Sequence, residues 1–143
     1  MSAAEFLAAA ARLDHGELRA LIRTLSEEEQ AVSTRRLALH RLIDRVRTEL
    51  IARAHEEGTE SPGLPASERE LQAWAERAFA DGAPDPRLDG FSAADAGRLL
   101  RLLRDVEADV SERRRELHAH IDLLHEELLD RLQRRIEQEP YST

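Results

Sequence analysis

The chain has 143 residues, 41% of them hydrophobic and only 3% aromatic, and its formal net charge is -8. This composition predicts a single all-α domain over residues 1–143 with an elongated aliphatic core, and it argues against a deep aromatic pocket. The lack of Cys excludes a disulfide framework and a thiolate metal site, while the negative charge argues against direct nucleic-acid binding and favours a partner with a basic surface.

The N-terminal segment, residues 1–25, is predicted to be a helical cover for another part of the molecule. Its hydrophobic residues recur at helical spacing, which predicts one or two short helices with Gly16 as the expected break. The longest apolar run, residues 6–11, is too short to cross a bilayer, and the segment lacks the basic start of a signal peptide. We therefore expect a cytoplasmic protein that does not contact a membrane. The predicted apolar face comprises Phe6, Leu7, Leu13, Leu18, Leu21, Ile22 and Leu25.

A first long helix is predicted over residues 27–57. Ser26 and Glu29 have the spacing of a capping box, which favours a helix start at this point, and Gly58 is a typical helix stop. On this evidence alone, Glu29 is a candidate cap residue.

The segment from 58 to 92 is predicted to be a linker that contains one short helix, residues 68–80. Ser67 and Glu70 again have capping-box spacing, and Gly and Pro residues lie on both sides of the helix. Trp74 and Phe79 are expected to belong to a local core, and a partner-docking site is the alternative.

A second long helix is predicted over residues 93–138. Ser92 and Asp95 give a further capping signal, and neither Gly nor Pro occurs between Gly97 and Pro140. At 1.5 Å per residue such a helix is about 68 Å long.

The two predicted long helices share a sequence repeat at a separation of 78 residues. About half of the positions from 29 to 53 are identical at this separation, so a general richness in Glu and Arg does not explain the match. The shared pattern is E-x3-S-x2-R-x3-H-x3-D, and on a helix its spacing places five side chains within roughly 80° of arc. The residues are Glu29, Ser33, Arg36, His40 and Asp44 in the first copy and Glu107, Ser111, Arg114, His118 and Asp122 in the second.

Each copy of the pattern interrupts a hydrophobic seam with an arginine. Apolar residues around Arg36 and Arg114 follow coiled-coil spacing, and each arginine occupies a seam position. A guanidinium beside a buried seam needs an anionic partner. That partner is either a Glu or Asp on the facing helix or a bound ligand, and the sequence leaves both open.

The helix lengths predict an antiparallel two-helix coiled-coil hairpin. In that arrangement the two polar stripes meet side by side around a local two-fold axis near Arg36 and Arg114, which suits a two-fold ligand. The second helix then extends beyond the start of the first by about 18 Å, and the N-terminal helices are expected to cover the extension. Its hydrophobic residues are Leu128, Leu129, Leu132 and Ile136.

The repeated pattern resembles the E-x3-S-x2-R-x3-Q-x3-D signature of the RsiG family, actinobacterial anti-sigma factors that carry one copy on each long helix of an antiparallel hairpin. The resemblance implies that this chain binds cyclic di-GMP, as an intercalated pair of molecules, through the ten repeat residues. It further implies that the loaded form sequesters a sporulation-type sigma factor of the WhiG kind. His40 and His118 stand where the family has Gln, and an imidazole offers one donor and one acceptor in place of an amide.

The residues also leave less specific interpretations open. Ser33 and Ser111 suit close helix packing, and Asp44 and Asp122 suit surface ion pairs. His118, Asp122 and His125 have metal-ligand spacing, but the first copy has Arg47 in the third position, so we expect no metal.

Two alternatives to the anti-sigma function remain. One is a cyclic-dinucleotide receptor or adaptor with a different protein partner, and the other is a ligand-free structural hairpin. We expect no enzyme activity, because the chain shows neither a Gly-rich phosphate loop nor a nucleophile with an adjacent base.

Overall fold

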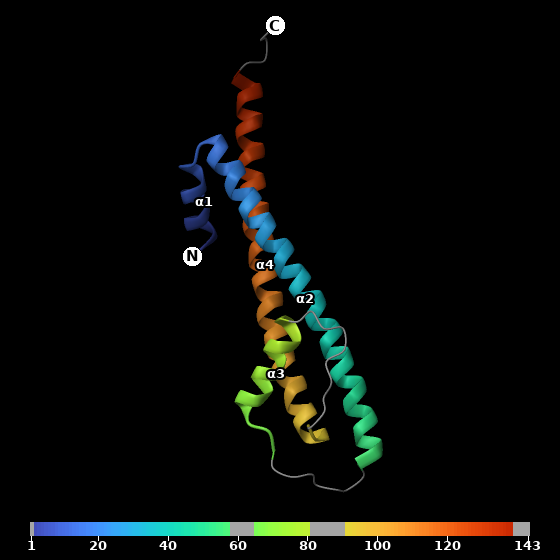
Figure 1. Cartoon of the computed structure of the whole chain (residues 1–143). Helices are drawn as coiled ribbons and strands as arrows, with labels where there is room; N and C mark the ends of the chain where they lie inside the picture. Colours follow the sequence, from blue (N-terminus) through green and yellow to red (C-terminus); the bar gives the residue numbers. More distant parts are fainter. Residues whose placement is uncertain (1, 58–64, 81–90, 139–143) are drawn as a thin grey trace. The chain divides into compact units, whose positions relative to one another are not determined.

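Helices account for nearly all of the described part of the chain, which comprises residues 2–57, 65–80 and 91–138 of the computed structural model (Figure 1). In chain order they are α1 (Ala3–Ala11), α2 (His15–Glu57), α3 (Glu68–Ala80) and α4 (Ala93–Gln138). No strand occurs in these ranges, so the predicted all-α class is confirmed. The long helices α2 and α4 have 43 and 46 residues and pack together. Most of the predicted linkers, residues 58–64 and 81–90, lies outside the described residues.

Two predicted helix starts are confirmed by hydrogen bonds at the caps. The backbone N–H of Glu70 donates to the hydroxyl of Ser67 at 3.2 Å, at the start of α3. The backbone N–H of Asp95 donates to the hydroxyl of Ser92 at 3.1 Å, at the start of α4. Each serine thus satisfies one of the donors that the first turn of a helix leaves without an internal partner.

The start of α2 differs from the prediction, because the helix begins at His15 and not after Ser26. The cap is formed by Asp14, whose carboxylate accepts from the backbone N–H of Glu17 at 2.7 Å, and the Glu17 carboxylate accepts in return from the N–H of Asp14 at 3.2 Å. Gly16 lies in the first turn of α2 and does not break a helix. The interpretation of Glu29 as a cap residue is therefore wrong, since α2 continues through it.

Contacts divide the chain into two compact units. Unit 1 contains residues 1–33 and 112–143, and unit 2 contains residues 34–111. Both long helices contribute to both units, with α1 in unit 1 and α3 in unit 2. The single domain over residues 1–143 stays a prediction.

The core of unit 1 forms where α1 and the start of α2 pack against α4. Leu18 and Leu124 are fully buried and Ala10 is 3% exposed. The N-terminal segment thus covers part of α4, as predicted, but Leu129 and Ile136 remain 56% and 70% exposed and the expectation that they are covered is wrong. The hydrophobic residues packed around this core are Phe6, Leu13, Leu21, Ile22, Leu25 and Leu128.

Polar and aromatic contacts hold α1 in place within unit 1. The side chain of Arg131 is only 13% exposed, and its guanidinium donates to the last carbonyls of α1, at 3.1 Å to Ala10 and 3.4 Å to Ala11, and pairs with Glu127 at 2.9 Å. Carbonyls at a helix end lack internal partners, so this arginine completes the C-terminal cap of α1. The rings of Phe6 and His120 stack with centroids 4.3 Å apart.

In unit 2, a buried carboxylate in the first turn of α4 contacts the segment that directly precedes α3. Asp95 is 3% exposed and accepts from the backbone N–H of Ala66 at 3.1 Å, while Arg98 donates to the carbonyl of Ala66 at 2.5 Å.

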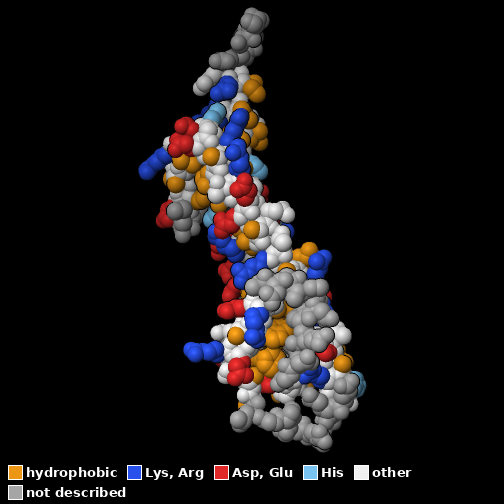
Figure 2. Space-filling model, viewed as in Figure 1, with side chains coloured by type: hydrophobic (Ala, Val, Ile, Leu, Met, Phe, Trp, Pro, Cys, Tyr) orange, Lys and Arg blue, Asp and Glu red, His pale blue; other side chains and the backbone are white. Residues whose placement is uncertain are grey.

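Trp74 is 9% exposed and meets Phe91 edge to face, so its prediction as local core is confirmed. The side chain of Phe79 lies outside the described residues. Figure 2 shows hydrophobic side chains gathered around α1 and around α3 on one face.

None of the helices in the described ranges combines the length and the apolar character that crossing a membrane requires.

Candidate functional site

The repeated pattern builds two polar clusters of the same design, one in each unit. In each cluster a Glu and a Ser come from one long helix, and an Arg and a His come from the other. The Glu107 cluster, in unit 2, consists of Glu107 and Ser111 from α4 with Arg36 and His40 from α2; the Glu29 cluster, in unit 1, consists of Glu29 and Ser33 from α2 with Arg114 and His118 from α4.

In the Glu107 cluster, one carboxylate oxygen gathers three side chains. The hydroxyl of Ser111 donates to Glu107 Oε1 at 2.6 Å and accepts from Arg36 Nε at 3.0 Å. The Nε2 atom of His40 lies 2.9 Å from the same oxygen, and Arg36 Nε lies 3.6 Å from it. Because Glu and Ser are four residues apart on one helix, and Arg and His four apart on the other, each pair shares a helix face.

The Glu29 cluster repeats these contacts within unit 1. Ser33 donates to Glu29 Oε1 at 2.6 Å and accepts from Arg114 Nε at 3.0 Å. His118 Nε2 lies 2.7 Å from that oxygen, and Arg114 Nε lies 3.5 Å from it. The sequence repeat therefore corresponds to a repeated set of cross-helix contacts, and eight of the ten predicted site residues take part in it.

Hydrogen bonds to the two carboxylates lower their pKa values. For Glu107 the hydrogen bond from Ser111 lowers the pKa most, followed by the bond from His40, and the charges of His40 and Arg36 add to the effect. The pKa of Glu29 is lowered in the same way, by Ser33 first and then by His118 and Arg114. Both carboxylates are ionised at neutral pH, and since an ionised carboxylate only accepts, each histidine presents a protonated Nε2 to it.

The seam arginines thus have facing carboxylates in this structure, which was one of the two alternatives for their anionic partner. Each uses its Nε atom, and the side chains of Arg36 and Arg114 are still 37% and 36% exposed. Within the described residues their terminal Nη groups donate no hydrogen bond. The clusters therefore hold each guanidinium in a fixed position while leaving its planar end open to an anion.

The carboxylates of the remaining two predicted site residues, Asp44 and Asp122, take no part in the hydrogen bonds and ion pairs of the clusters. Both side chains are exposed, and neither carboxylate forms an ion pair with another described residue. The interpretation of these residues as surface ion pairs is thus not supported in the described part of the chain. Asp44 lines a pocket of unit 2, next to His40 and Glu107.

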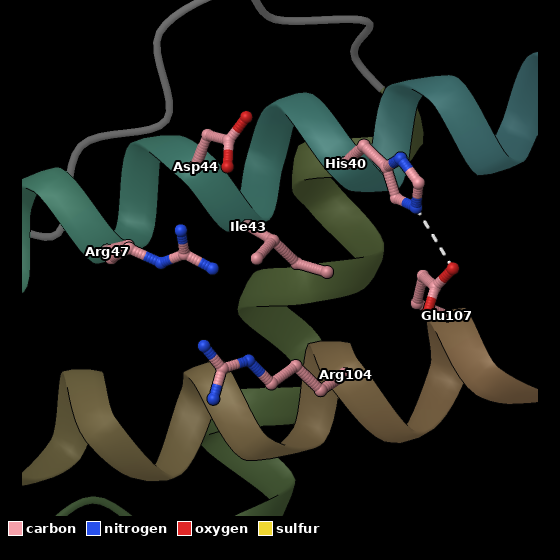
Figure 3. Close-up of a pocket in the computed structure, with 6 residues that line it drawn as sticks. All are labelled: His40, Ile43, Asp44, Arg47, Arg104 and Glu107. Atoms are coloured by element: carbon pink, nitrogen blue, oxygen red, sulfur yellow. Dashed lines mark hydrogen bonds and ion pairs between the residues drawn. The ribbon is translucent and has the colours of Figure 1, made fainter.

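This pocket has a volume of about 300 Å³ and includes two residues that the sequence prediction missed (Figure 3). Arg47 and Arg104 line it with Ile43 and the three residues just named. The sequence contained a signal for both arginines. Arg47 follows Glu29 by 18 residues, about five helical turns, and so shares its face. Arg104 precedes Glu107 by three residues, a spacing that makes the two side chains neighbours on the helix surface. Each arginine extends one polar stripe, but the repeat itself does not include them.

Among the residues that the structure describes, no three His, Asp or Glu side chains are placed to hold a metal ion.

The fold and the site define an all-helical protein whose polar site is built twice across two long helices. The family model described as RsiG-like matches this chain over residues 4–72 and 82–141. These ranges cover more than half of the chain, and the chain belongs to the RsiG-like family. Membership supports a role of the anti-sigma-factor type, with a sigma factor as the general kind of partner. No curated protein and no solved structure matches the chain.

Proposed function

We propose that the chain is a cyclic di-GMP-binding anti-sigma factor, which sequesters a WhiG-type sigma factor in its ligand-loaded form. The observation that carries the proposal is the duplicated cluster, in which Arg36 and Arg114 are each positioned by a serine and a glutamate. Surface ion pairs contribute little stability on their own, so stability alone does not explain why the same set of contacts occurs twice.

The chemistry of the ligand fits the residues of the clusters. Cyclic di-GMP carries two phosphates and two guanines, related by two-fold symmetry, and the motif likewise occurs twice. Arg donates to phosphate oxygens or to guanine O6 and N7, and carboxylates accept from guanine N1 and N2. The ten repeat residues are the proposed contacts, with Asp44 and Asp122 as carboxylates that have no ion-pair partner among the described residues.

On this proposal, a ligand that binds must compete with Glu29 and Glu107 for the two motif arginines. In the structure Glu29 and Glu107 neutralise Arg114 and Arg36. A phosphate offers a second anion to the exposed Nη groups, so it joins or displaces the glutamate. The proposed intercalated pair of ligand molecules brings several anionic groups close to Glu29 and Glu107. These two carboxylates must then move away, or cationic groups must balance their charge.

We also propose that α2 and α4 form an antiparallel coiled-coil hairpin. In unit 2, Arg36 contacts Ser111 and the later residue His40 contacts the earlier Glu107. In unit 1 the order is likewise opposed, since Glu29 contacts His118 and Ser33 contacts Arg114. Leu39 and Leu117, the seam residues that follow the motif arginines, are fully buried, as a coiled-coil seam requires.

The remaining elements of the proposal concern the partner. The net charge of -8 suits a sigma factor, whose DNA-binding surface is basic, better than DNA itself. A sigma-factor partner places the proposed function in the cytoplasm. We propose no enzymatic activity and no metal, since the clusters provide anion contacts and no activated nucleophile.

Titration of the purified protein with cyclic di-GMP by calorimetry tests the proposal, with cyclic di-AMP and GTP as controls. We expect saturable binding of cyclic di-GMP that is much tighter than that of either control. Absence of binding would favour the structural hairpin. Binding of cyclic di-GMP without retention of the sigma factor in a pull-down would favour a receptor or adaptor with a different partner.

A further inference from the structure

The pocket of unit 2 brings together two arginines from different helices. Figure 3 shows the guanidinium groups of Arg47, from α2, and Arg104, from α4, on facing sides of the pocket. They lie at the end away from the hydrogen bond between His40 and Glu107. Ile43, which is 7% exposed, contributes an apolar wall. Two positive groups therefore line one open pocket.

Neither arginine has an anionic partner in the described part of the chain. No hydrogen bond or ion pair joins Arg47 or Arg104 to a described carboxylate. Glu107 already accepts from Ser111 and His40. Asp44 precedes Arg47 by three residues on the same helix, a spacing that permits an ion pair, yet it forms none there. The carboxylates of the pocket thus leave both guanidinium groups unpaired.

Arg47 and Arg104 are both exposed, so water weakens the repulsion between their guanidinium groups, and the repulsion grows where a bound molecule displaces that water. An anion with several oxygen atoms relieves it by accepting from both. Phosphate fits this requirement best, because its oxygens take the planar, forked donors of Arg two at a time. A single carboxylate has fewer acceptor directions for two arginines that come from opposite helices.

The other copy of the motif lacks this feature. At the separation of 78 residues that relates the copies, Arg47 corresponds to His125 and Arg104 corresponds to Ser26. Both of those side chains are exposed in unit 1. The two clusters therefore have the same central contacts but different surroundings, and only the Glu107 cluster adjoins a pair of arginines at these positions.

We propose that Arg47 and Arg104 form a subsite for a phosphate group beside the Glu107 cluster, and that the Glu29 cluster lacks this subsite. That the phosphate compound is cyclic di-GMP rests on the proposed function. That the two arginines bind a phosphate group does not depend on it. The phosphate belongs either to the bound cyclic dinucleotide or to a separate phosphate compound, and both sources present the same group to the arginines.

The test compares the wild-type chain with the double variant Arg47→Gln/Arg104→Gln. The matched control is Arg41→Gln/Arg101→Gln, because Arg41 and Arg101 are exposed residues of unit 2 on the same two helices and their removal changes the net charge equally. Each protein is titrated by calorimetry with inorganic pyrophosphate alone, with cyclic di-GMP alone, and with cyclic di-GMP in the presence of pyrophosphate. Circular dichroism verifies that all three remain helical.

If the dinucleotide supplies the phosphate, its affinity falls about 10- to 100-fold in the Arg47→Gln/Arg104→Gln variant and not in the control, as expected for lost hydrogen bonds to a charged group. If a separate compound supplies it, pyrophosphate binding falls selectively while the affinity for cyclic di-GMP is unchanged. Equal behaviour of the variant and the control with both probes would overturn the subsite. Failure of the wild type to bind cyclic di-GMP contradicts the proposed function, and pyrophosphate binding then decides the subsite by itself.

A gain-of-function variant provides a second, independent test. Ser26→Arg/His125→Arg places two arginines at the corresponding positions of the Glu29 cluster, without altering any residue of either motif copy. We expect pyrophosphate to bind at about twice the wild-type stoichiometry. An unchanged stoichiometry together with an unaffected Arg47→Gln/Arg104→Gln variant would show that the arginines do not constitute a site.

Discussion

The Nε atom of Arg36 donates a hydrogen bond of 3.0 Å to the hydroxyl of Ser111 on the opposite long helix. Ser111 in turn donates to Glu107 at 2.6 Å, so the serine connects the arginine to a carboxylate 3.6 Å away. This arrangement fixes a guanidinium at a position where coiled coils usually place a hydrophobic side chain. A site that is already organised loses less side-chain entropy when a ligand arrives.

Replacement of either motif arginine, by Arg36→Ala or Arg114→Ala, is expected to abolish cyclic di-GMP binding and to leave the protein helical. The ion pairs to Glu107 and Glu29 are partly exposed, so we expect their loss to change the free energy of unfolding by only about 0–1 kcal/mol. Calorimetry and circular dichroism measure the two effects. Arg134→Ala, which removes an exposed arginine paired with Asp130, is the control. Unchanged ligand affinity in both motif variants would contradict the proposed role of the clusters.

The lowered pKa values of Glu29 and Glu107 predict a contribution to acid stability. A carboxyl whose pKa is lower in the folded state binds fewer protons there than in the unfolded chain, so acid favours unfolding. The contribution is complete above the ordinary value of 4.5 and is lost as the pH falls through the lower folded value. Thermal unfolding between about pH 5 and pH 3 should therefore depend less on pH in Glu29→Gln/Glu107→Gln.

The control for the acid measurement is Glu49→Gln/Glu126→Gln, which removes two exposed carboxylates from the same helices. We expect this variant to follow the wild-type pH profile. An equal flattening in both double variants would mean that general charge, and not the hydrogen bonds from Ser33 and Ser111, determines the acid response.

The packing of α1 predicts which leucine side chains of α4 contribute most to the stability of unit 1. Leu124 is fully buried beside Ala10 and Leu18, whereas Leu129 is 56% exposed on the same helix. Leu124→Ala is expected to lower the free energy of unfolding by about 2–5 kcal/mol, from lost burial and the cavity that remains. Leu129→Ala should change it by less than about 0.5 kcal/mol. Urea unfolding followed by circular dichroism measures both, and similar losses would contradict the assigned core.

Much of the fold was predictable because the relevant signals are local. Ser67 and Ser92 each cap the helix that the sequence indicated, and the bounds of α3, Glu68–Ala80, agree with the predicted 68–80. The repeat also indicated which residues lie on one helix face. The start of α2 was not predictable from Ser26 and Glu29, because the same two residue types serve other purposes inside a helix. Glu29 accepts from Ser33 and His118 instead of from its own helix start.

The composition of the site was predictable in part. The repeat indicated the eight residues of the two clusters, since each is periodic on its own helix. Arg47 and Arg104 were missed because their significance depends on the register of α2 against α4, which the sequence of either helix alone does not contain. The sequence also did not indicate that Asp44 would line the same pocket as His40 and Glu107 without an ion pair to a described residue, because only side-chain geometry decides this.

Ligand and sigma factor are predicted to bind with positive coupling. In the structure Glu29 and Glu107 contact His118 and His40 as well as the nearby arginines. A ligand that takes over those donors changes the cross-helix contacts of α2 and α4, and a partner that recognises the changed helices favours the loaded form. By linkage, the factor by which cyclic di-GMP raises sigma affinity equals the factor by which sigma raises ligand affinity, typically about 5- to 150-fold.

The measurement is a pair of titrations, of the sigma factor into the protein with and without cyclic di-GMP, and of cyclic di-GMP into the protein with and without the sigma factor. The sigma factor is the WhiG-type protein from the same genome, and a DNA duplex is the control for charge-driven binding. Arg36→Ala should retain only the weaker, ligand-independent sigma affinity, because it removes a proposed ligand contact and no proposed sigma contact. Equal sigma affinity in the two conditions would exclude the switch, and unequal coupling factors in the two directions would indicate that a third component takes part.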